Sequence, residues 1–383
     1  MLQILNNQAS KQTTSKQSHK PRVAYFQRKR IEGATFSLES IFNDVRKRLS
    51  DRIEPITHIS KYGSRGVLPR FLISLQAARH QGDINHVVGD IHFATLFLNR
   101  RTTILTIHDT YTAERLRGIR KKLFVLFWLK LPAWKSAFIT TVSEFSKGQF
   151  LAYLGMEKSI LVIPSSVSDK ISFSPKEFNE KKPRILIVGT KLNKNVDRML
   201  DAVAGLDCKL AIVGKLSASQ SHSLSSHKID YENFVDLSFD RLIEEYKSCD
   251  LLAFCSTYEG FGMPIIEANR CGRPVVTSNV ASMPEVAGDA ACLVDPYSVE
   301  SIRCGIKRVI SNRDYRQELI QNGLKNERRF RADDAAQNYW KIYSDILESN
   351  RRSSSVDPGI STNADAHQKM AKFTTNYPTR RET

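Results

Sequence analysis

The chain lacks the short patterns that mark several common classes of protein. Its six cysteines lie between Cys208 and Cys304 without a Cys-x-x-Cys pair, so we expect buried, reduced thiols and no zinc site. No hydrophobic run reaches the roughly 20 residues that a membrane-spanning helix needs. No Asp-x-Asp metal motif stands out, and a Walker sequence is missing. These absences argue against a zinc protein, a membrane-spanning protein and a P-loop NTPase.

Acidic residues are few relative to basic ones. Lys and Arg number 57 against 40 Asp and Glu, which gives a formal net charge of +17 and a pI near 9.6. The basic residues are scattered in short clusters, and no RNA-binding signature accompanies them. The charge therefore favours phosphate-rich substrates and anionic inner-leaflet lipid over nucleic acid. A plain solvated surface, or an RNA-binding protein with steeply salt-dependent affinity, is the alternative.

The most apolar stretch of the chain, residues 123–139, is interrupted by two lysines and a proline. It is predicted to form a helix that faces the core. The alternative is a helix that lies in a membrane interface, because aromatic residues stand beside the lysines. These aromatic residues are Phe124, Phe127, Trp128 and Trp134.

The order of the apolar segments predicts an α/β fold with parallel sheets. A chain of 383 residues with 41% hydrophobic side chains can fill two cores. Short apolar runs alternate with helical patterns, as is typical of parallel sheets. The expected strands of the first half are Arg22–Gln27, His86–Val88, Thr103–Ile107, Ala137–Val142 and Ile160–Ile163. Those of the second half are Arg184–Gly189, Lys209–Gly214, Leu251–Cys255 and Pro274–Thr277.

Composition divides the chain into two Rossmann-like domains with flanking segments. The expected parts are a disordered tail (1–20), a first domain (21–171), a linker rich in Pro, Lys and Glu (172–183), a second domain (184–337), a final amphipathic helix (338–348) and a flexible tail (349–383). Ligands of such sheets bind beyond the carboxyl ends of the strands. The cleft between the two domains is therefore the expected site.

Two glutamates bracket the most informative run of the sequence, Glu259-Gly-Phe-Gly-Met-Pro-Ile-Ile-Glu267. A buried strand precedes this run, and Pro264 suits the first turn of a helix. Glu259 is expected on the loop and Glu267 in the first helical turn. Gly260 and Gly262 let the backbone approach a ligand, and a helix N-terminus favours phosphate. The pattern indicates a site for an anionic ligand with several hydroxyl groups. Two surface glutamates that only stabilise a helix start are the alternative.

A cationic loop opens the second domain. Gly189 ends the strand, Thr190 follows it, and Lys194 stands just before a helix expected to start near Val196. The loop has no Gly-x-Gly-x-x-Gly run, so it is not the common dinucleotide-binding loop. A lysine at such a turn can neutralise a diphosphate. Lys215 follows the next strand and can approach the nucleotide, or it is simply solvated.

In the first domain, His108 ends the strand Thr103–Ile107 and is followed by Asp109. An imidazole at this place can exchange hydrogen bonds with a sugar hydroxyl near neutral pH. A His-Asp pair that only caps a turn is the alternative. Ser143 is a good helix N-cap, and Glu285 reads as an early-helix charge rather than a catalytic group.

These segments together resemble glycosyltransferase family 4, the retaining "glycosyl transferases group 1". The similar segments are Glu259–Glu267, Val188–Asn195, Ile107–Thr110, Thr141–Lys147 and Ser278–Val286. The likeness covers roughly residues 22–347. Two departures stand out: Ile163-Pro-Ser-Ser-Val167 replaces the Asn-Gly turn that is common before the linker, and the N-terminal loop has only one glycine.

The resemblance implies a B-type glycosyltransferase fold (GT-B), in which two Rossmann-like domains face each other across a cleft. It implies transfer with retention from a nucleotide-diphosphate sugar, either GDP-mannose or a UDP-sugar, with no catalytic metal and no cofactor. By this likeness Lys194, Glu259 and His108 serve catalysis. The donor contacts would come from Glu267, Gly260, Phe261, Gly262, Met263, Gly189, Thr190 and Lys215, and the acceptor or phosphate loop would be Gly33, Ala34 and Thr35.

The expected partners are a nucleotide sugar and a glycan or lipid-linked oligosaccharide acceptor used in surface polysaccharide synthesis. The expected location is the cytoplasm, with peripheral contact at the inner face of an anionic membrane. The alternatives are a degenerate, non-catalytic glycosyltransferase-like scaffold and a sugar-nucleotide epimerase or phosphorylase on a similar fold. A glycoside hydrolase is disfavoured, because a carboxylate at a helix dipole suits a fixed anion better than an acid of raised pKa.

Overall fold

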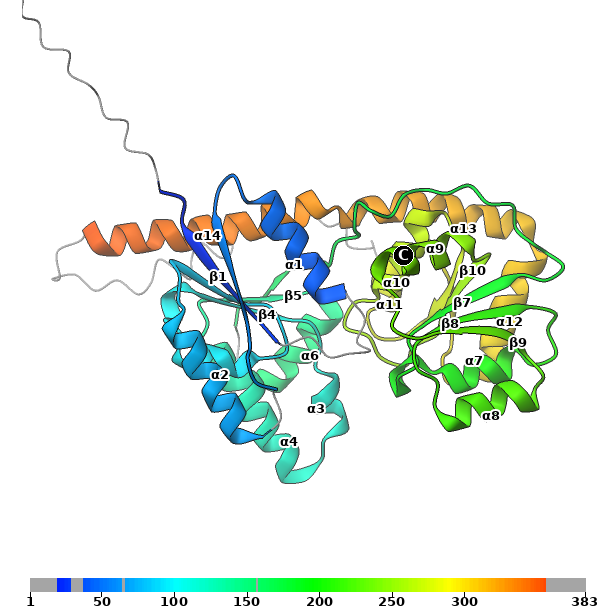
Figure 1. Cartoon of the computed structure of the whole chain (residues 1–383), viewed down its shortest axis with the longest axis horizontal. Helices are drawn as coiled ribbons and strands as arrows, with labels where there is room; N and C mark the ends of the chain where they lie inside the picture. The colour runs from blue at the N-terminus through cyan, green and yellow to red at the C-terminus, as the bar shows by residue number, and fades with distance from the viewer. Residues whose placement is uncertain (1–18, 29–36, 64–65, 156–157, 356–383) are drawn as a thin grey trace, which may run out of the picture.

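The computed structural model describes residues 19–28, 37–63, 66–155 and 158–355. These residues form two α/β halves that lie side by side, with helices of the C-terminal segment running along both (Figure 1). No helix among them is long and apolar enough to cross a lipid bilayer.

The first half is built on a six-stranded sheet in which all neighbouring strands run parallel. Its strand order is β2-β1-β3-β4-β5-β6. The bounds are β1 (Arg22–Gln27), β2 (Glu54–Ile59), β3 (Ile84–Val87), β4 (Thr103–Ile107), β5 (Phe138–Thr141) and β6 (Leu161–Val162). The helices are α1 (Ser37–Arg48), α2 (Val67–Arg79), α3 (Tyr111–Arg115), α4 (Gly118–Phe124), α5 (Leu131–Trp134) and α6 (Glu144–Leu154). Short 3-10 turns η1 (His92–Phe97) and η2 (Arg100–Thr102) and a π-helical segment η3 (Val125–Lys130) complete it.

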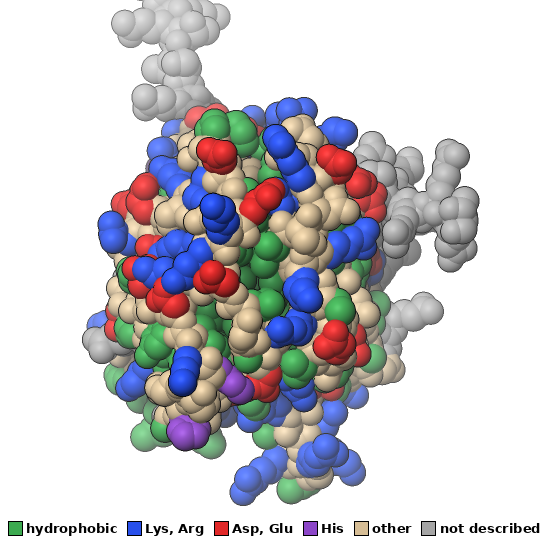
Figure 2. All heavy atoms as spheres, turned by 90° about the vertical axis from the view of Figure 1, so that its right-hand side faces the viewer, with side chains coloured by type: hydrophobic (Ala, Val, Ile, Leu, Met, Phe, Trp, Pro, Cys, Tyr) green, Lys and Arg blue, Asp and Glu red, His purple; other side chains and the backbone are tan. Residues whose placement is uncertain are grey.

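The second half contains another parallel six-stranded sheet, with the order β12-β11-β10-β7-β8-β9. The strands are β7 (Arg184–Val188), β8 (Lys209–Val213), β9 (Asp230–Phe234), β10 (Leu251–Phe254), β11 (Val275–Ser278) and β12 (Cys292–Val294). The helices are α7 (Val196–Val203), α8 (Ala218–Ser226), α9 (Phe239–Ser248), α10 (Met263–Cys271), α11 (Met283–Ala287), α12 (Val299–Ser311) and α13 (Arg313–Asn326), with turns η4 (Leu192–Lys194) and η5 (Glu327–Phe330). Basic and acidic side chains are interspersed on the surface at this end of the molecule (Figure 2).

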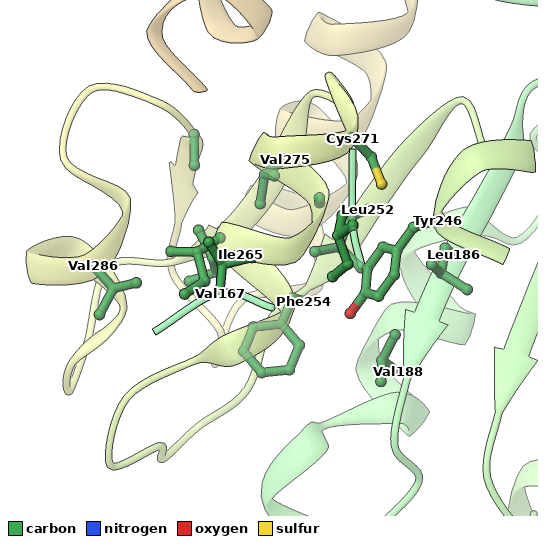
Figure 3. Close-up of a cluster of buried hydrophobic side chains, with 14 of the residues drawn as sticks. Val167, Leu186, Val188, Tyr246, Leu252, Phe254, Ile265, Cys271, Val275 and Val286 are labelled. Carbon is green, nitrogen blue, oxygen red and sulfur yellow. The ribbon is translucent and has the colours of Figure 1, made fainter. Parts of the chain in front are cut away.

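The central strands are apolar over most of their length because helices cover both faces of each sheet. Strands β7, β8 and β10 read RILIV, KLAIV and LLAF, and nearly all their residues are buried. Figure 3 shows one of the resulting cores, in which the ring of Tyr246 from α9 lies among Leu186, Leu252 and Phe254. Five of the six cysteines are buried and Cys304 is exposed, so the expectation of buried thiols is wrong for Cys304.

The long helix α14 (Ala332–Ser355) returns to the first half and packs against its sheet. It is longer than the predicted 338–348, and residues 349–355 are helical rather than a tail. Tyr343 of α14 lies in a buried polar cluster: its Oη is 2.9 Å from Tyr25 Oη and 2.8 Å from His86 Nδ1. Because buried polar groups need partners, this cluster fixes how α14 sits on the sheet.

Sequence reasoning missed three strands, β2, β9 and β12. Each lies at or next to the edge of its sheet, and β2 and β9 carry polar side chains and little apolar signal. Edge strands face solvent, so their residues need not be hydrophobic. The stretch 123–139 is also not one core-facing helix. It divides into α4, η3, α5 and β5, and Leu123, Phe127 and Trp134 are exposed.

Candidate active site

The candidate site lies where the strand order of the second sheet reverses. Strands β7 and β10 are neighbours there, while the chain after β7 moves to β8 and the chain after β10 moves to β11. The loops that leave these two strands therefore diverge and open a crevice at their carboxyl ends. Lys194 comes from the first loop and Glu259 from the second.

An ion pair joins the two loops. Lys194 Nζ lies 2.7 Å from Glu259 Oε1, and Asn193 Nδ2 donates to the same oxygen at 3.2 Å. The two charged side chains are 19% and 15% exposed, so the pair is largely shielded from bulk water. The ammonium group also lies 4.7 Å from the centroid of the Phe254 ring. Sequence reasoning named Lys194 and Glu259 but missed Asn193. The available signal was that Asn193 directly precedes Lys194 in the same loop.

Glycines make room for this arrangement. Gly189 has φ +90°, and a Cβ added there would lie 2.9 Å from Lys194 Cε, so a side chain at residue 189 would displace the lysine. Gly214 has φ +135°, and a Cβ there would meet Thr190 Oγ1 at 2.8 Å. Thr190 Oγ1 donates instead to the carbonyl of Lys215 at 2.6 Å, while the Lys215 side chain is exposed. Thr190 thus links the loop after β7 to the loop after β8, and Lys215 lies on the exposed side of the second of these loops.

Helix α10 has Pro264 in its first turn, as the sequence predicted, and Gly262 at its N-cap (φ +112°). Glu267, however, is not in that first turn. It is the fifth residue of the helix, it is 6% exposed, and its Oε2 accepts a hydrogen bond from Tyr246 Oη at 2.6 Å. The prediction is wrong by about one residue, because the helix begins at Met263 and its first turn ends just before Glu267.

Burial raises the pKa of Glu267 from 4.5 to about 7, and the Tyr246 hydrogen bond and the charge of Lys194 only partly oppose this shift. The argument that a helix dipole keeps Glu267 a fixed anion is therefore wrong. Of the two glutamates, Glu259 is the one that forms an ion pair, with Lys194.

The raised pKa predicts a pH dependence of stability. Between pH 4.5 and 7 the folded protein holds the Glu267 proton more tightly than the unfolded chain does, so the free energy of unfolding falls as pH rises through this window. The full loss is on the order of 3 kcal/mol for a shift of this size. We expect Glu267→Gln to flatten the fall in Tm between pH 5 and 8, measured by thermal melting at constant ionic strength. Parallel curves for the wild type and the variant would contradict the assignment.

His108 lies at the carboxyl end of β4 in the first half, and it is 7% exposed. Its Nε2 donates to the carbonyl of Val88 at 2.9 Å. The backbone of His108 approaches Gly260 so closely that a Cβ on Gly260 would lie 2.0 Å from the His108 carbonyl oxygen. Asp109 Oδ1 accepts from the backbone N–H of Tyr111 at 2.9 Å, which is the turn-capping role considered for it. The two halves therefore touch at the loop that carries Glu259.

Further hydrogen bonds cross between the two halves at the same loop. The hydroxyls of Ser143 and Ser146 donate to the Gly260 carbonyl at 2.6 and 2.9 Å. The Glu285 carboxylate accepts from the backbone N–H groups of Glu144 and Phe145 at 2.9 and 3.1 Å. Ser143 is the N-cap of α6 and Glu285 lies in the first turn of α11, as predicted. Their contact with each other's half was missed, because partners 140 residues apart leave no local signal.

The Glu285 contact gives a second prediction. The carboxylate stabilises the N-terminus of α6, where backbone N–H groups lack helical partners. We expect Glu285→Ala to reduce stability by about 1–2 kcal/mol and Glu285→Gln by less, since the amide keeps one acceptor oxygen. Thermal unfolding measures this effect, with the exposed Glu318→Ala as the matched control. Equal losses in Glu285→Ala and Glu318→Ala would show that the interdomain cap contributes nothing.

The remaining predicted residues divide into three groups. Phe261 is 6% exposed and the centroid of its ring lies 5.4 Å from that of Phe330, so its side chain belongs to the core. Met263 is half-buried against the same core. Gly33, Ala34 and Thr35 lie outside the described residues. Among the residues that are described, no three His, Cys, Asp or Glu side chains are grouped to hold a metal ion.

Tyr258 is another residue that sequence reasoning missed. Its hydroxyl is 3.0 Å from Thr110 Oγ1, and its ring centroid is 5.2 Å from that of Tyr111, both in the other half. It precedes Glu259 directly, and this position next to the motif was the available signal. Two parallel Rossmann-like sheets with a cation at a strand-order reversal are an arrangement typical of proteins that bind anionic ligands at the carboxyl ends of their strands.

Comparison with known proteins finds a family match over part of the chain. Residues 168–326 match the family described as "Glycosyl transferases group 1". A serotype-specific mannosyltransferase, WbdA, of Escherichia coli is 32% identical over 144 residues, which are 38% of this chain and 17% of WbdA. O-antigen chain mannosyltransferase B of the same organism is 41% identical over 85 residues, 22% of either chain. The chain thus spans about a fifth of the length of these curated relatives.

Among solved structures, Anabaena Alr3699/HepE in complex with UDP and glucose superimposes with a TM-score of 0.68 at 16% identity. The match covers 85% of this chain and all of HepE. At this identity the likeness shows the fold, which is the GT-B arrangement of two Rossmann-like domains. The family expected from the sequence, glycosyl transferases group 1, is confirmed over residues 168–326.

Proposed function

We propose that the protein transfers a sugar, with retention of anomeric configuration, from GDP-mannose or a UDP-sugar to a glycan or lipid-linked acceptor in surface polysaccharide synthesis. The observation that carries this proposal is the Lys194–Glu259 ion pair beside the N-terminus of α10, at the strand-order reversal of the second sheet. The mannosyltransferase names of the two Escherichia coli relatives and the UDP and glucose bound by HepE support the donor class.

Lys194 neutralises the diphosphate in this proposal. Its ammonium group is held by a carboxylate and an aromatic face, so it is already positioned before a donor arrives. Negative charge develops on the diphosphate as the bond to the sugar breaks, and a fixed cation there stabilises the transition state. The N–H groups at the start of α10 add to this effect. In this proposal Lys194 and these N–H groups neutralise the diphosphate, and no metal ion is assigned to that task.

The two glutamates and His108 hold the rest of the donor. Tyr246 occupies Oε2 of Glu267, and the proposal assigns Oε1 to a ribose hydroxyl. Glu259 and the backbone of Gly260–Met263 position the sugar, and His108 contacts it from the first half. Lys215 and Thr190 are assigned to the nucleotide part of the donor. Thr190 acts through its hydrogen bond to the carbonyl of Lys215, which joins their two loops.

The test is a thermal-shift panel of UDP, GDP, ADP and their common sugar conjugates on the intact chain. A ligand that binds only the folded state raises Tm according to its excess over Kd. We expect one nucleotide family to stabilise the protein and the Lys194→Ala and Glu267→Ala variants to lose that shift. Transfer of the matching sugar with a retained anomeric signal by NMR would complete the assignment. No shift with any nucleotide would instead favour a non-catalytic scaffold.

A further inference from the structure

A large part of the first half carries basic residues without acidic ones. Residues 66–79, 91–108 and 115–143 contain eleven lysines and arginines and no aspartate or glutamate. These segments include α2, η1, η2, α4, η3 and α5. Their charge is much more one-sided than the mixed surface at the other end of the molecule (Figure 2). A concentration of one sign on a few adjacent elements indicates an anionic partner.

The same elements expose large apolar side chains. Val67 and Leu68 at the start of α2 are 83% and 67% exposed, and Ile119 of α4 is 67% exposed. The other exposed apolar side chains of this region are Phe71, Phe97, Leu123, Leu126, Phe127 and Trp134. A soluble surface normally exposes such residues singly, so a group of them on adjoining elements marks an interaction site.

Ring contacts show that these elements form one continuous surface. The Arg70 guanidinium of α2 lies 4.3 Å from the Trp128 ring centroid of η3, and Phe71 packs edge-on against Phe97 of η1. Arg100 and Lys135 both lie over the Trp134 ring, at 5.1 and 5.4 Å. We call the exposed side chains of α2, η1, η2, α4, η3 and α5 the basic apolar face. Cations lie over its tryptophan rings, and Trp side chains beside Lys and Arg are typical of the boundary of a membrane.

We propose that the basic apolar face binds the surface of an anionic phospholipid bilayer. The ammonium and guanidinium groups of its lysines and arginines would pair with lipid phosphates, while Leu123, Phe127 and Trp134 enter the membrane interface. A second copy of this chain would bring two positively charged faces together, so charge complementarity favours lipid over self-association. Nucleic acid would account for the charge but not for nine large exposed apolar side chains.

The face adjoins the candidate active site through α3. This helix begins three residues after His108, and Tyr111 at its start packs against Tyr258 across the cleft. Helix α4 follows α3 after two residues and lies lowest in the view of Figure 1. A bilayer on this face would therefore lie beside the cleft entrance. Membrane binding itself does not depend on transfer; only its use in presenting a lipid-linked acceptor rests on the proposed function.

The experiment is co-sedimentation of the full chain with vesicles of phosphatidylcholine alone or with 30% phosphatidylglycerol, without any donor. We expect sedimentation only with the anionic vesicles. Lys121→Glu/Lys122→Glu should lower partitioning by at least about tenfold, since each basic residue near an anionic surface contributes about fivefold. Leu123→Ser/Phe127→Ser should weaken it at unchanged charge. Lys307→Glu/Lys325→Glu, exposed residues of α12 and α13, makes the same charge change on the other half and should retain binding.

Several results would overturn the proposal. Equal losses in the Lys121/Lys122 and Lys307/Lys325 variants would mean that net charge, not this face, binds the vesicles. Full binding by Leu123→Ser/Phe127→Ser would mean that no apolar side chain enters the bilayer. Absence of vesicle binding together with tight RNA binding, or with a concentration-dependent dimer, would assign the face to another partner. The nucleotide thermal shift should persist in the face variants, so failure of this proposal is distinguishable from failure of the proposed function.

Discussion

Gly260→Ala is expected to separate the two domains and to lower sugar transfer by at least about 100-fold, because displacement of reacting groups by an ångström has effects of that size. A Cβ at this position would lie 2.0 Å from the His108 carbonyl oxygen and 2.9 Å from Asp109 Cβ. The carbonyl oxygen is backbone, so no side-chain rotation can relieve the overlap. The loop that carries Glu259 must therefore move away from the first half.

Small-angle scattering and activity together measure this effect. The radius of gyration of Gly260→Ala should increase, and the hydrogen bonds from Ser143 and Ser146 to the Gly260 carbonyl should be lost. Gly148→Ala is the matched control, because Gly148 lies in α6 with nothing within 4 Å of an added Cβ. The control should keep activity and gain about 0.5–1 kcal/mol of stability from helix propensity. A Gly260→Ala protein with wild-type activity would show that the close contact is not needed for transfer.

Lys194→Ala is expected to reduce kcat by about 100- to 1000-fold, the range seen when one fixed group that stabilises transition-state charge is removed. The variant also leaves Glu259 in the crevice with Asn193 as its hydrogen-bond donor. The carboxylate would then repel the incoming diphosphate instead of being neutralised. We therefore expect a raised KM in addition to the lowered kcat.

Lys191→Ala separates this specific effect from a general loss of positive charge. Lys191 is exposed and lies in the same loop, three residues before Lys194. Steady-state kinetics with the donor identified by the thermal-shift panel should show near wild-type kcat for Lys191→Ala. If the two lysine variants lose activity equally, the loop acts through its overall charge, and Lys194 has no special role at the diphosphate.

The interpretation of the first half shows where sequence reasoning is limited. The buried strands β1 and β4 have the predicted bounds, since uninterrupted apolar runs have few other ways to be buried. The stretch 123–139 is also rich in apolar residues, but its side chains are divided between the core and the surface. Composition alone does not determine which apolar side chains are buried, because burial depends on packing against elements distant in the sequence.

Local patterns placed Lys194 and Glu259 on loops that follow strands and Pro264 in the first turn of α10. Strand ends, glycine turns and a helix-starting proline are properties of a few consecutive residues, and the carboxyl ends of parallel strands share one edge. The fold class, and the family match of residues 168–326, therefore follow from the sequence by itself, while the site remains a prediction.

Only the tertiary structure decided how these residues meet. It joined Lys194 to Glu259, buried Glu267 against Tyr246 with a pKa of about 7, and placed Glu285 at the N-terminus of α6. It also brought α2, η1, η3 and α5 together into one basic apolar face. The physical reason is that distances between segments far apart in the chain, and the burial that shifts a pKa, arise from packing of the whole molecule.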